Sequence, residues 1–400
     1  MALLLRSRGA ILLLMLNIFL IFMGIGLVIP VMPQYMTELD ISGSVVGLLV
    51  GAFSLTQLLF SPMAGRLSDA LGRKKIIVAG MLVFALSEAL FGIANSAALL
   101  FASRLLGGMG AAMIMPAVMA YTADMTSNEE RAKGMGLINA AITTGFIIGP
   151  GIGGYLAEFG LRVPFFAAAA AGLAAAIWTA FVLPESRPAA SPDSKPSTSE
   201  KQDRLWSLLR RSYREPYFLS LVLVFVMSFG LANYETIFGL FVDRKFGFST
   251  KEIAFILTFG SIAGAVVQLT VFGRILNRFG ERNVITFCLL SCGLFVLLTI
   301  VVDGFWMVFA VTFIVFLSID ILRPAIGTQM SRMAEERQGY VAGLNSAFTS
   351  LGNIMGPVIA GALFDVDVNY PYMLAAGVLI LSFLLSASAR RREAGATATG

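Results

Sequence analysis

The sequence predicts an all-α membrane protein with twelve transmembrane helices in two pseudo-symmetric six-helix bundles. Hydrophobic residues make up 57% of the 400 residues and charged residues only 13%, so the chain is more apolar than a water-soluble domain can be. About twelve apolar stretches are long enough to cross a bilayer as helices. A segment rich in glycine and proline also recurs about half a chain length after its first copy.

The apolar stretches define the expected helices in chain order. The first stretch follows Arg6 and Arg8, but it is too long for the core of a signal peptide and lacks a cleavage pattern, so we expect a retained helix. The expected spans are 11–36, 45–64, 76–94, 97–124, 134–157, 163–184, 217–242, 252–272, 284–302, 305–331, 340–364 and 371–389.

Three pairs of segments show that the second half of the chain repeats the first. Their offsets are 207 or 208 residues: Gly145-Phe-Ile-Ile-Gly149-Pro150-Gly-Ile-Gly153-Gly154 with Gly352-Asn-Ile-Met-Gly356-Pro357-Val-Ile-Ala-Gly361, Gly65-Arg-Leu-Ser-Asp69-Ala-Leu-Gly72-Arg73 with Gly273-Arg-Ile-Leu-Asn277-Arg-Phe-Gly280-Glu281, and Pro116 with Pro324. Clustered glycine and proline suit close helix packing in membranes. We therefore expect an N-terminal bundle over 1–184, a Pro- and Ser-rich linker over 185–216 and a C-terminal bundle over 217–400, an organisation typical of alternating-access carriers.

Basic residues are concentrated in every second loop between the expected helices. The only basic residues in the opposite loops are Arg162, Arg244, Lys245 and Lys251. By the positive-inside rule, both termini and the linker are cytoplasmic. The net charge of +5 thus reflects membrane topology, and no nucleic-acid partner is expected.

The sequence lacks the marks of an enzyme or a metal site. Cys288 and Cys292 are four residues apart on one expected helix, where packing is the simplest role. No nucleophile–base pair, metal-ligand cluster or phosphate loop is present. We therefore expect no enzyme activity and no cofactor, and we expect a monomer. Since the chain has no histidine, any coupled proton would be carried by carboxylates.

Five ionisable residues fall within the expected spans: Glu88, Arg104, Glu235, Asp320 and Arg323. Each costs about 2.5–3.5 kcal/mol at the bilayer centre on insertion scales, so a function is the default interpretation. Asp320 and Arg323, three residues apart on one helix, can pair. A buried ion pair that only stabilises packing also explains these two, whereas Glu235 has no local partner in the sequence.

The repeat helps to interpret these charges. At an offset of 208, Glu235 corresponds to Leu27, Asp320 to Ala112 and Arg323 to Met115. The repeated scaffold therefore does not require them, which favours proton coupling by Glu235, Asp320 and Arg323. For Arg104, function and packing with its guanidinium held by carbonyls remain equally open, and Glu88 ranks lower.

The sequence also resembles the major facilitator superfamily over its whole length. Gly65-x-Leu-x-Asp69-x-x-Gly72-Arg73-Lys74 resembles the family's loop 2–3 motif, Arg104-Leu-Leu-Gly107-Gly-Met-Gly110 its helix 4 motif, and Gly145-x-x-x-Gly149-Pro150-x-x-Gly153-Gly154 the helix 5 motif of drug/proton antiporters. The stretches 17–30 and 343–350 are similar to those of the NorA and Bmr multidrug efflux pumps of Gram-positive bacteria. This resemblance implies a proton-coupled exporter of lipophilic or cationic compounds in a bacterial cell membrane.

Two of these motifs also have a physical interpretation. The loop 2–3 motif suggests a tight turn whose Asp69 could accept hydrogen bonds from the first backbone amides of a helix near Tyr340, a latch that the resemblance supports; a plain basic turn is the alternative. The glycine–proline segment predicts a close helix seam. Its role in setting the direction of antiport is implied by resemblance alone.

The resemblance also suggests which residues contact substrate. Because the resemblance places their helices around the cavity, we select Phe19, Gln57, Tyr234, Asn345 and Phe348, together with Glu235. Three alternatives stay open: an exporter specific for one metabolite or antibiotic, an importer such as a sugar symporter, and a membrane receptor or scaffold that does not transport. The scarcity of polar pairs in the spans argues against sugars.

Overall fold

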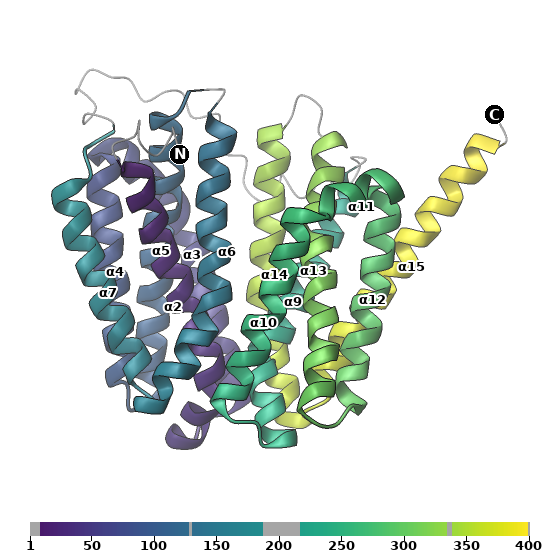
Figure 1. Cartoon of the computed structure of the whole chain (residues 1–400), viewed down its shortest axis with the longest axis horizontal. Coiled ribbons are helices and arrows are strands. Elements are labelled where there is room, and N and C mark those ends of the chain that lie inside the picture. The colour runs from purple at the N-terminus through teal and green to yellow at the C-terminus, as the bar shows by residue number, and fades with distance from the viewer. Residues whose placement is uncertain (1–8, 128–129, 187–216, 334–337, 399–400) are drawn as a thin grey trace. The chain divides into compact units, whose positions relative to one another are not determined.

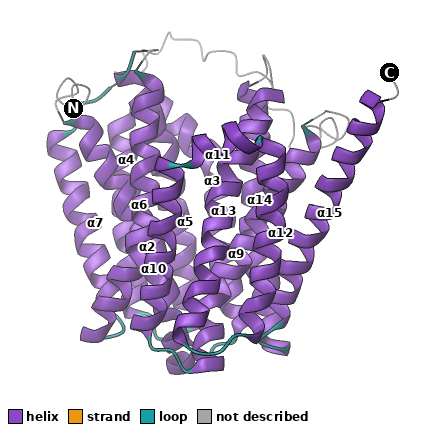
Figure 2. Ribbon diagram, turned by 45° about the vertical axis from the view of Figure 1, so that its right-hand side comes forward, coloured by secondary structure: helices purple, strands orange, loops and turns teal. Residues whose placement is uncertain are grey.

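The described parts of the chain fold into α-helices. The computed structural model describes residues 9–127, 130–186, 217–333 and 338–398, and none of these residues forms a strand (Figure 2). Helices suit a lipid environment because they satisfy their backbone hydrogen bonds internally. The elements, labelled in Figure 1, are α2 (Ala10–Leu39), α3 (Gly43–Leu71), α4 (Arg73–Ile93), α5 (Ala97–Met125), α6 (Arg131–Leu156), η1 (Ala157–Phe159), α7 (Val163–Val182), α9 (Phe218–Phe246), α10 (Thr250–Thr270), α11 (Phe272–Phe279), α12 (Glu281–Val301), α13 (Phe305–Met333), α14 (Gln338–Val366) and α15 (Tyr370–Ala398).

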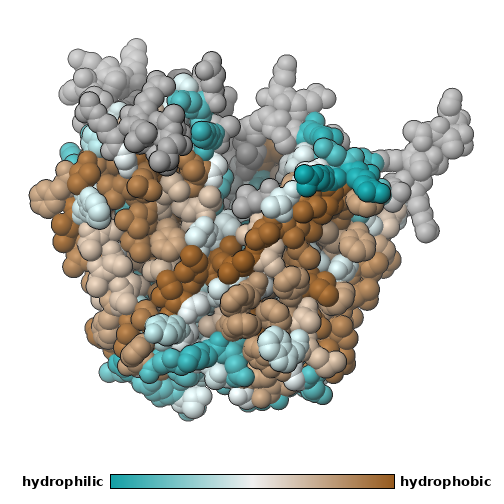
Figure 3. Space-filling view, viewed as in Figure 1, coloured by the Kyte–Doolittle hydropathy of each residue, from teal (hydrophilic) through white to brown (hydrophobic). Residues whose placement is uncertain are grey.

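Twelve of the described helices are long and apolar enough to cross a membrane, and each coincides with one predicted span. Large apolar side chains are exposed on them; Phe181 and Trp306, for example, are 84% and 70% exposed. On the face seen in Figure 3, apolar side chains cover the middles of the helices and polar ones gather near their ends. The predicted all-α, multi-pass membrane fold is confirmed.

The helices form two compact units. Unit 1 contains Met1–Ile41, Leu48–Ser199 and Ser249–Thr258, and unit 2 contains Ser42–Gly47, Glu200–Phe248 and Phe259–Gly400. The first residues of α3, up to Gly47, thus belong to unit 2, whereas the rest of α3 belongs to unit 1. The first residues of α10, up to Thr258, belong to unit 1, whereas the rest of α10 belongs to unit 2. The predicted linker over 185–216 stays a prediction, since 187–216 lie outside the described residues.

In unit 1, α6 packs directly against α2 (Figure 1). The contact is made through the glycines of α6. A Cβ atom added to Gly145, Gly149 or Gly153 would lie 2.7 Å from a backbone carbonyl oxygen of α2. Pro150 belongs to the same contact, whereas Gly154 contacts Ala254, a residue grouped with unit 1. The predicted close seam is confirmed, and its role in antiport stays a prediction.

Unit 2 repeats this packing between α14 and α9. A Cβ atom at Gly352 would lie 2.7 Å from the Phe229 backbone nitrogen, and one at Gly356 would lie 2.6 Å from the Phe229 carbonyl oxygen. Gly352 and Gly356 are the repeat partners of Gly145 and Gly149. The sequence repeat therefore corresponds to a repeated helix–helix contact.

The structure corrects one sequence prediction. Residues 65–71 do not form a turn, because α3 continues to Leu71 and the Gly72 amide still donates to the Ser68 carbonyl at 3.2 Å. The chain turns only at Gly72, whose φ of +102° is strained for any other residue. The apolar stretch ends earlier than the helix because the last turns of α3 carry polar side chains.

Candidate functional site

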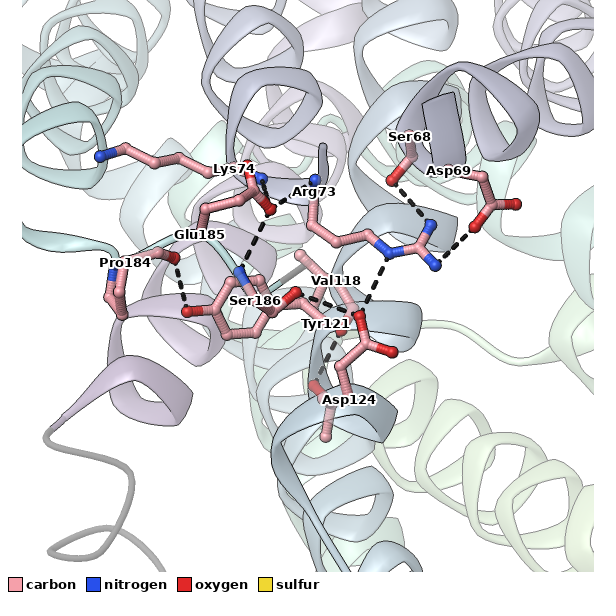
Figure 4. A network of polar contacts seen from close by, with 11 residues as sticks. Ser68, Asp69, Arg73, Lys74, Val118, Tyr121, Asp124, Pro184, Glu185 and Ser186 are labelled. Carbon is pink, nitrogen blue, oxygen red and sulfur yellow. Dashed lines mark hydrogen bonds and ion pairs between the residues drawn. The ribbon is translucent and has the colours of Figure 1, made fainter. Parts of the chain in front are cut away.

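The first turn of α4, where the loop motif ends, is capped by a carboxylate that is distant in sequence (Figure 4). Glu185 Oε1 accepts hydrogen bonds from the backbone amides of Arg73 at 2.8 Å and Lys74 at 3.4 Å. These are first-turn amides of α4, which have no partner within the helix, so Glu185 acts as a cap. A Cβ atom at Gly72 would lie 2.5 Å from Glu185 Oε2, so glycine is needed there for space as well as for conformation.

Arg73 is the centre of a polar network next to this cap. It is 6% exposed, and its guanidinium contacts Asp69 at 2.5 Å, Ser68 Oγ at 3.1 Å and Asp124 at 3.3 Å (Figure 4). Asp69 and Arg73 of the predicted motif are thus brought together. The predicted contact of Asp69 with the helix near Tyr340 stays a prediction, because the Tyr340 side chain lies outside the described residues.

Two of the ionisable residues predicted from the spans form a pair inside unit 1. Arg104 Nη2 on α5 lies 3.6 Å from Glu88 Oε1 on α4, and the two residues are only 5% and 2% exposed. The guanidinium also lies 4.3 Å from the centroid of the Phe91 ring. Arg104 Nε and Nη2 have no hydrogen-bond partner among the described residues, so neither atom is held by a carbonyl, as the packing alternative would require.

The three predicted coupling residues lie near one another in unit 2. Glu235 on α9 is within electrostatic range of both Asp320 and Arg323 on α13, a helix that packs against α9. The two carboxylates are partly buried and Arg323 is exposed. Among the described side chains, no ion pair within 4 Å joins Arg323 to either carboxylate, so these charges are close but not locked together. Such a group can attract a cation or exchange a proton without first breaking a short ion pair.

The predicted substrate residues have different environments. Phe19 lines an apolar cavity of about 600 Å³ in unit 1 between α2, α6 and α7. Tyr234 is 1% exposed, and its hydroxyl lies 3.0 Å from Thr312 Oγ1 in the core of unit 2, which disfavours direct contact with substrate. Phe348 is 9% exposed, whereas Gln57 and Asn345 are partly buried. Their roles in binding stay predictions.

Two residues that the sequence did not single out shape these sites. Glu185 was expected to be the first residue of the linker, but its carboxylate caps α4. Gly264 on α10 lies against the carboxylate of Asp320. The repeat could have pointed to Gly264, because the corresponding residue of the first half, at an offset of 208, is the larger Thr56.

Comparison with known proteins agrees with this architecture. The chain is 48% identical to multidrug resistance protein 2 of Bacillus subtilis, covering 92% of each chain. It is 41% identical to the quinolone resistance protein NorA of Staphylococcus aureus, covering 92% of this chain and 93% of that protein. Among solved structures, the nucleoside transporter NupG shares the fold, with a TM-score of 0.80 and 15% identity over 95% of this chain and 99% of NupG.

The family assignment follows from a direct match to a family model. The model described as Major Facilitator Superfamily matches residues 14–269 and 220–399, which together include nearly every described helix. The family and these relatives are transporters and not enzymes, as predicted. Together with the repeated helix seams and the twelve spans, the match shows that the chain belongs to the Major Facilitator Superfamily.

Proposed function

We propose that the protein is a proton-coupled antiporter that exports lipophilic, often cationic drugs and dyes by alternating access. The observation that supports it most directly is the group formed by Glu235, Asp320 and Arg323 in unit 2. These charges lie in otherwise apolar helices, and the equivalent positions of the first half are uncharged. The names of the relatives, which refer to multidrug and quinolone resistance, support the same class of substrate.

In the proposed cycle, Glu235 and Asp320 attract a cationic substrate that arrives from the cytoplasm or the inner leaflet. The carrier then exposes the site outward, protons neutralise the two carboxylates, and the substrate leaves because its counter-charge is lost. The protonated carrier returns and releases its protons inward. Arg323, three residues after Asp320 on α13, adds a positive charge to this group.

The membrane potential can contribute to this cycle. Each elementary charge moved through the membrane field gains about 2.3 kcal/mol per 100 mV, and a tenfold concentration ratio corresponds to about 1.4 kcal/mol. The proposal includes a monomer in a bacterial cell membrane with both termini in the cytoplasm. The proton is the only coupling ion, and no cofactor takes part.

The proposal can be tested with purified protein in vesicles under an imposed pH gradient. We expect ethidium movement driven by the gradient in the wild type, and a loss of at least tenfold in Glu235→Gln and Asp320→Asn. Asp303→Asn is the matched control, since Asp303 is an exposed carboxylate in the loop between α12 and α13. Undiminished efflux in both variants would overturn the coupling residues, and a wild type that moves no cationic dye would overturn the substrate class.

A further inference from the structure

Helix α10 leaves room for the Asp320 carboxylate at one glycine. If Gly264 carried a Cβ atom, that atom would overlap Asp320 Oδ2 and would lie 2.6 Å from Asp320 Cγ and 3.0 Å from Asp320 Cβ. The carboxylate therefore occupies the space where any other residue at position 264 would place its side chain. One turn earlier, a Cβ atom at Gly260 would lie 2.9 Å from Phe316 Cδ2, at the edge of an uncharged ring.

The internal repeat indicates that this space is specific to the second half. At an offset of 208, Gly264 corresponds to Thr56 and Asp320 to Ala112. The first half thus combines a larger residue on one helix with a small one on the other, and the second half reverses the sizes. Volume-conserving exchanges of this kind are the ones that packed interiors tolerate best. Gly264 and Asp320 therefore differ in size from their repeat partners in opposite directions, although Thr56 itself lies against Gly108 in the first half.

The charged groups around Asp320 come from α9 and from its own helix. Arg323 on α13 and Glu235 on α9 are within its electrostatic range. From residue 253 to its end, α10 carries no charge. The other helices packed on α13 are α12 and α14. The titratable and charged groups of α12 are Glu281 and Arg282 in its first turn and the thiols of Cys288 and Cys292. The charged group of α14 is Asp365 in its last turn.

We propose that Gly264 is a positioning residue for proton coupling, because the missing Cβ lets the Asp320 carboxylate lie against the backbone of α10. This inference rests on the proposed function, in which Asp320 exchanges the proton. A methyl group at position 264 would push the carboxylate aside. Since the three close atoms all belong to the Asp320 side chain, rotation of that side chain lets the fold accept the change, and the carboxylate takes a new position relative to Glu235 and Arg323.

The test is the pH profile of ethidium efflux in vesicles for Gly264→Ala and Gly260→Ala. Both variants add one methyl group to the same face of α10. We expect the midpoint of the curve of efflux rate against pH to move by about 0.5 pH unit or more in Gly264→Ala. In Gly260→Ala it should stay within about 0.2 pH unit of wild type. In the background of Asp320→Asn, Gly264→Ala should cause no further change, as a double-mutant cycle requires when one residue acts through the other.

The possible outcomes separate this inference from the proposed function. Full proton-driven efflux in Asp320→Asn would overturn the coupling role of Asp320. Impaired efflux in Asp320→Asn together with identical pH profiles for the two alanine variants would overturn the role of Gly264 alone. If Gly264→Ala does not fold, the double variant Gly264→Ala with Asp320→Ala should restore folded protein, because alanine at position 320 removes the side chain that the new methyl group would meet. Failure to restore folded protein would also refute the inference.

Discussion

Replacing Glu88 by glutamine should destabilise unit 1 by about 3–5 kcal/mol, the usual cost of removing one partner from a buried ion pair. Glu88 and Arg104 are 2% and 5% exposed, and their charged groups are 3.6 Å apart. Glutamine keeps the size of the side chain but leaves the guanidinium without a counter-charge. The contact of Arg104 with the Phe91 ring, at 4.3 Å, can offset only part of the loss.

This loss can be measured by thermal unfolding in detergent, following the monodisperse peak in size-exclusion chromatography. With about 2–4 °C per kcal/mol for a unit of this size, the apparent midpoint should fall by roughly 6–20 °C. Asp303→Asn, which removes an exposed carboxylate, should change stability by less than about 0.5 kcal/mol. A midpoint for Glu88→Gln within about 2 °C of wild type would refute the reasoning.

The paired replacement Glu88→Met with Arg104→Met distinguishes the two interpretations of Arg104. Apolar residues of similar volume often replace a buried ion pair without loss of stability, so this double variant should recover most of the midpoint. If it also transports dye like the wild type, the pair serves packing. If it is stable but inactive, Arg104 or Glu88 has a function in transport.

Three further predictions concern packing and caps. Gly149→Ala should lower stability by about 1–3 kcal/mol because its methyl group meets the α2 backbone, whereas Gly136→Ala on the same helix, with open space around it, should not lower it; equal midpoints for the two variants would contradict the seam. Glu185→Ala should cost about 1 kcal/mol through loss of the cap on α4, and an unchanged midpoint would show that water replaces it. Tyr234→Phe should cost about 1–3 kcal/mol because Thr312 loses its buried partner, but ethidium affinity should stay at the wild-type value; weaker dye binding would indicate that Tyr234 contacts substrate.

Much of the fold could be predicted because its signals are local. A span of about 20 apolar residues is sufficient to identify a helix that crosses a bilayer, so all twelve spans were predicted from composition. The offsets of 207 and 208 predicted two similar halves, and the glycines of the repeat predicted close seams. The end of α3 was misjudged because hydropathy follows contact with lipid, whereas hydrogen bonding decides where a helix ends.

The candidate site was only partly predictable. The energetic cost of burying charge identified Glu235, Asp320 and Arg323, and also Glu88 and Arg104, as unusual. It did not identify their neighbours. Helical periodicity indicates which residues share a face of one helix, so Asp320 and Arg323 could be related from sequence. It does not indicate which helix lies opposite that face.

The sequence by itself determined the membrane environment, the twelve membrane-spanning helices found among the described residues, the duplication and the residues whose charge requires an explanation. Only the tertiary structure decided which groups meet. It paired Glu88 with Arg104, brought Glu185 to the start of α4, and placed Gly264 against Asp320. The physical reason is that apolar spans are specified by the free energy of transfer into lipid, which depends on composition, whereas partners are specified by side-chain volume and contact between helices distant in the chain.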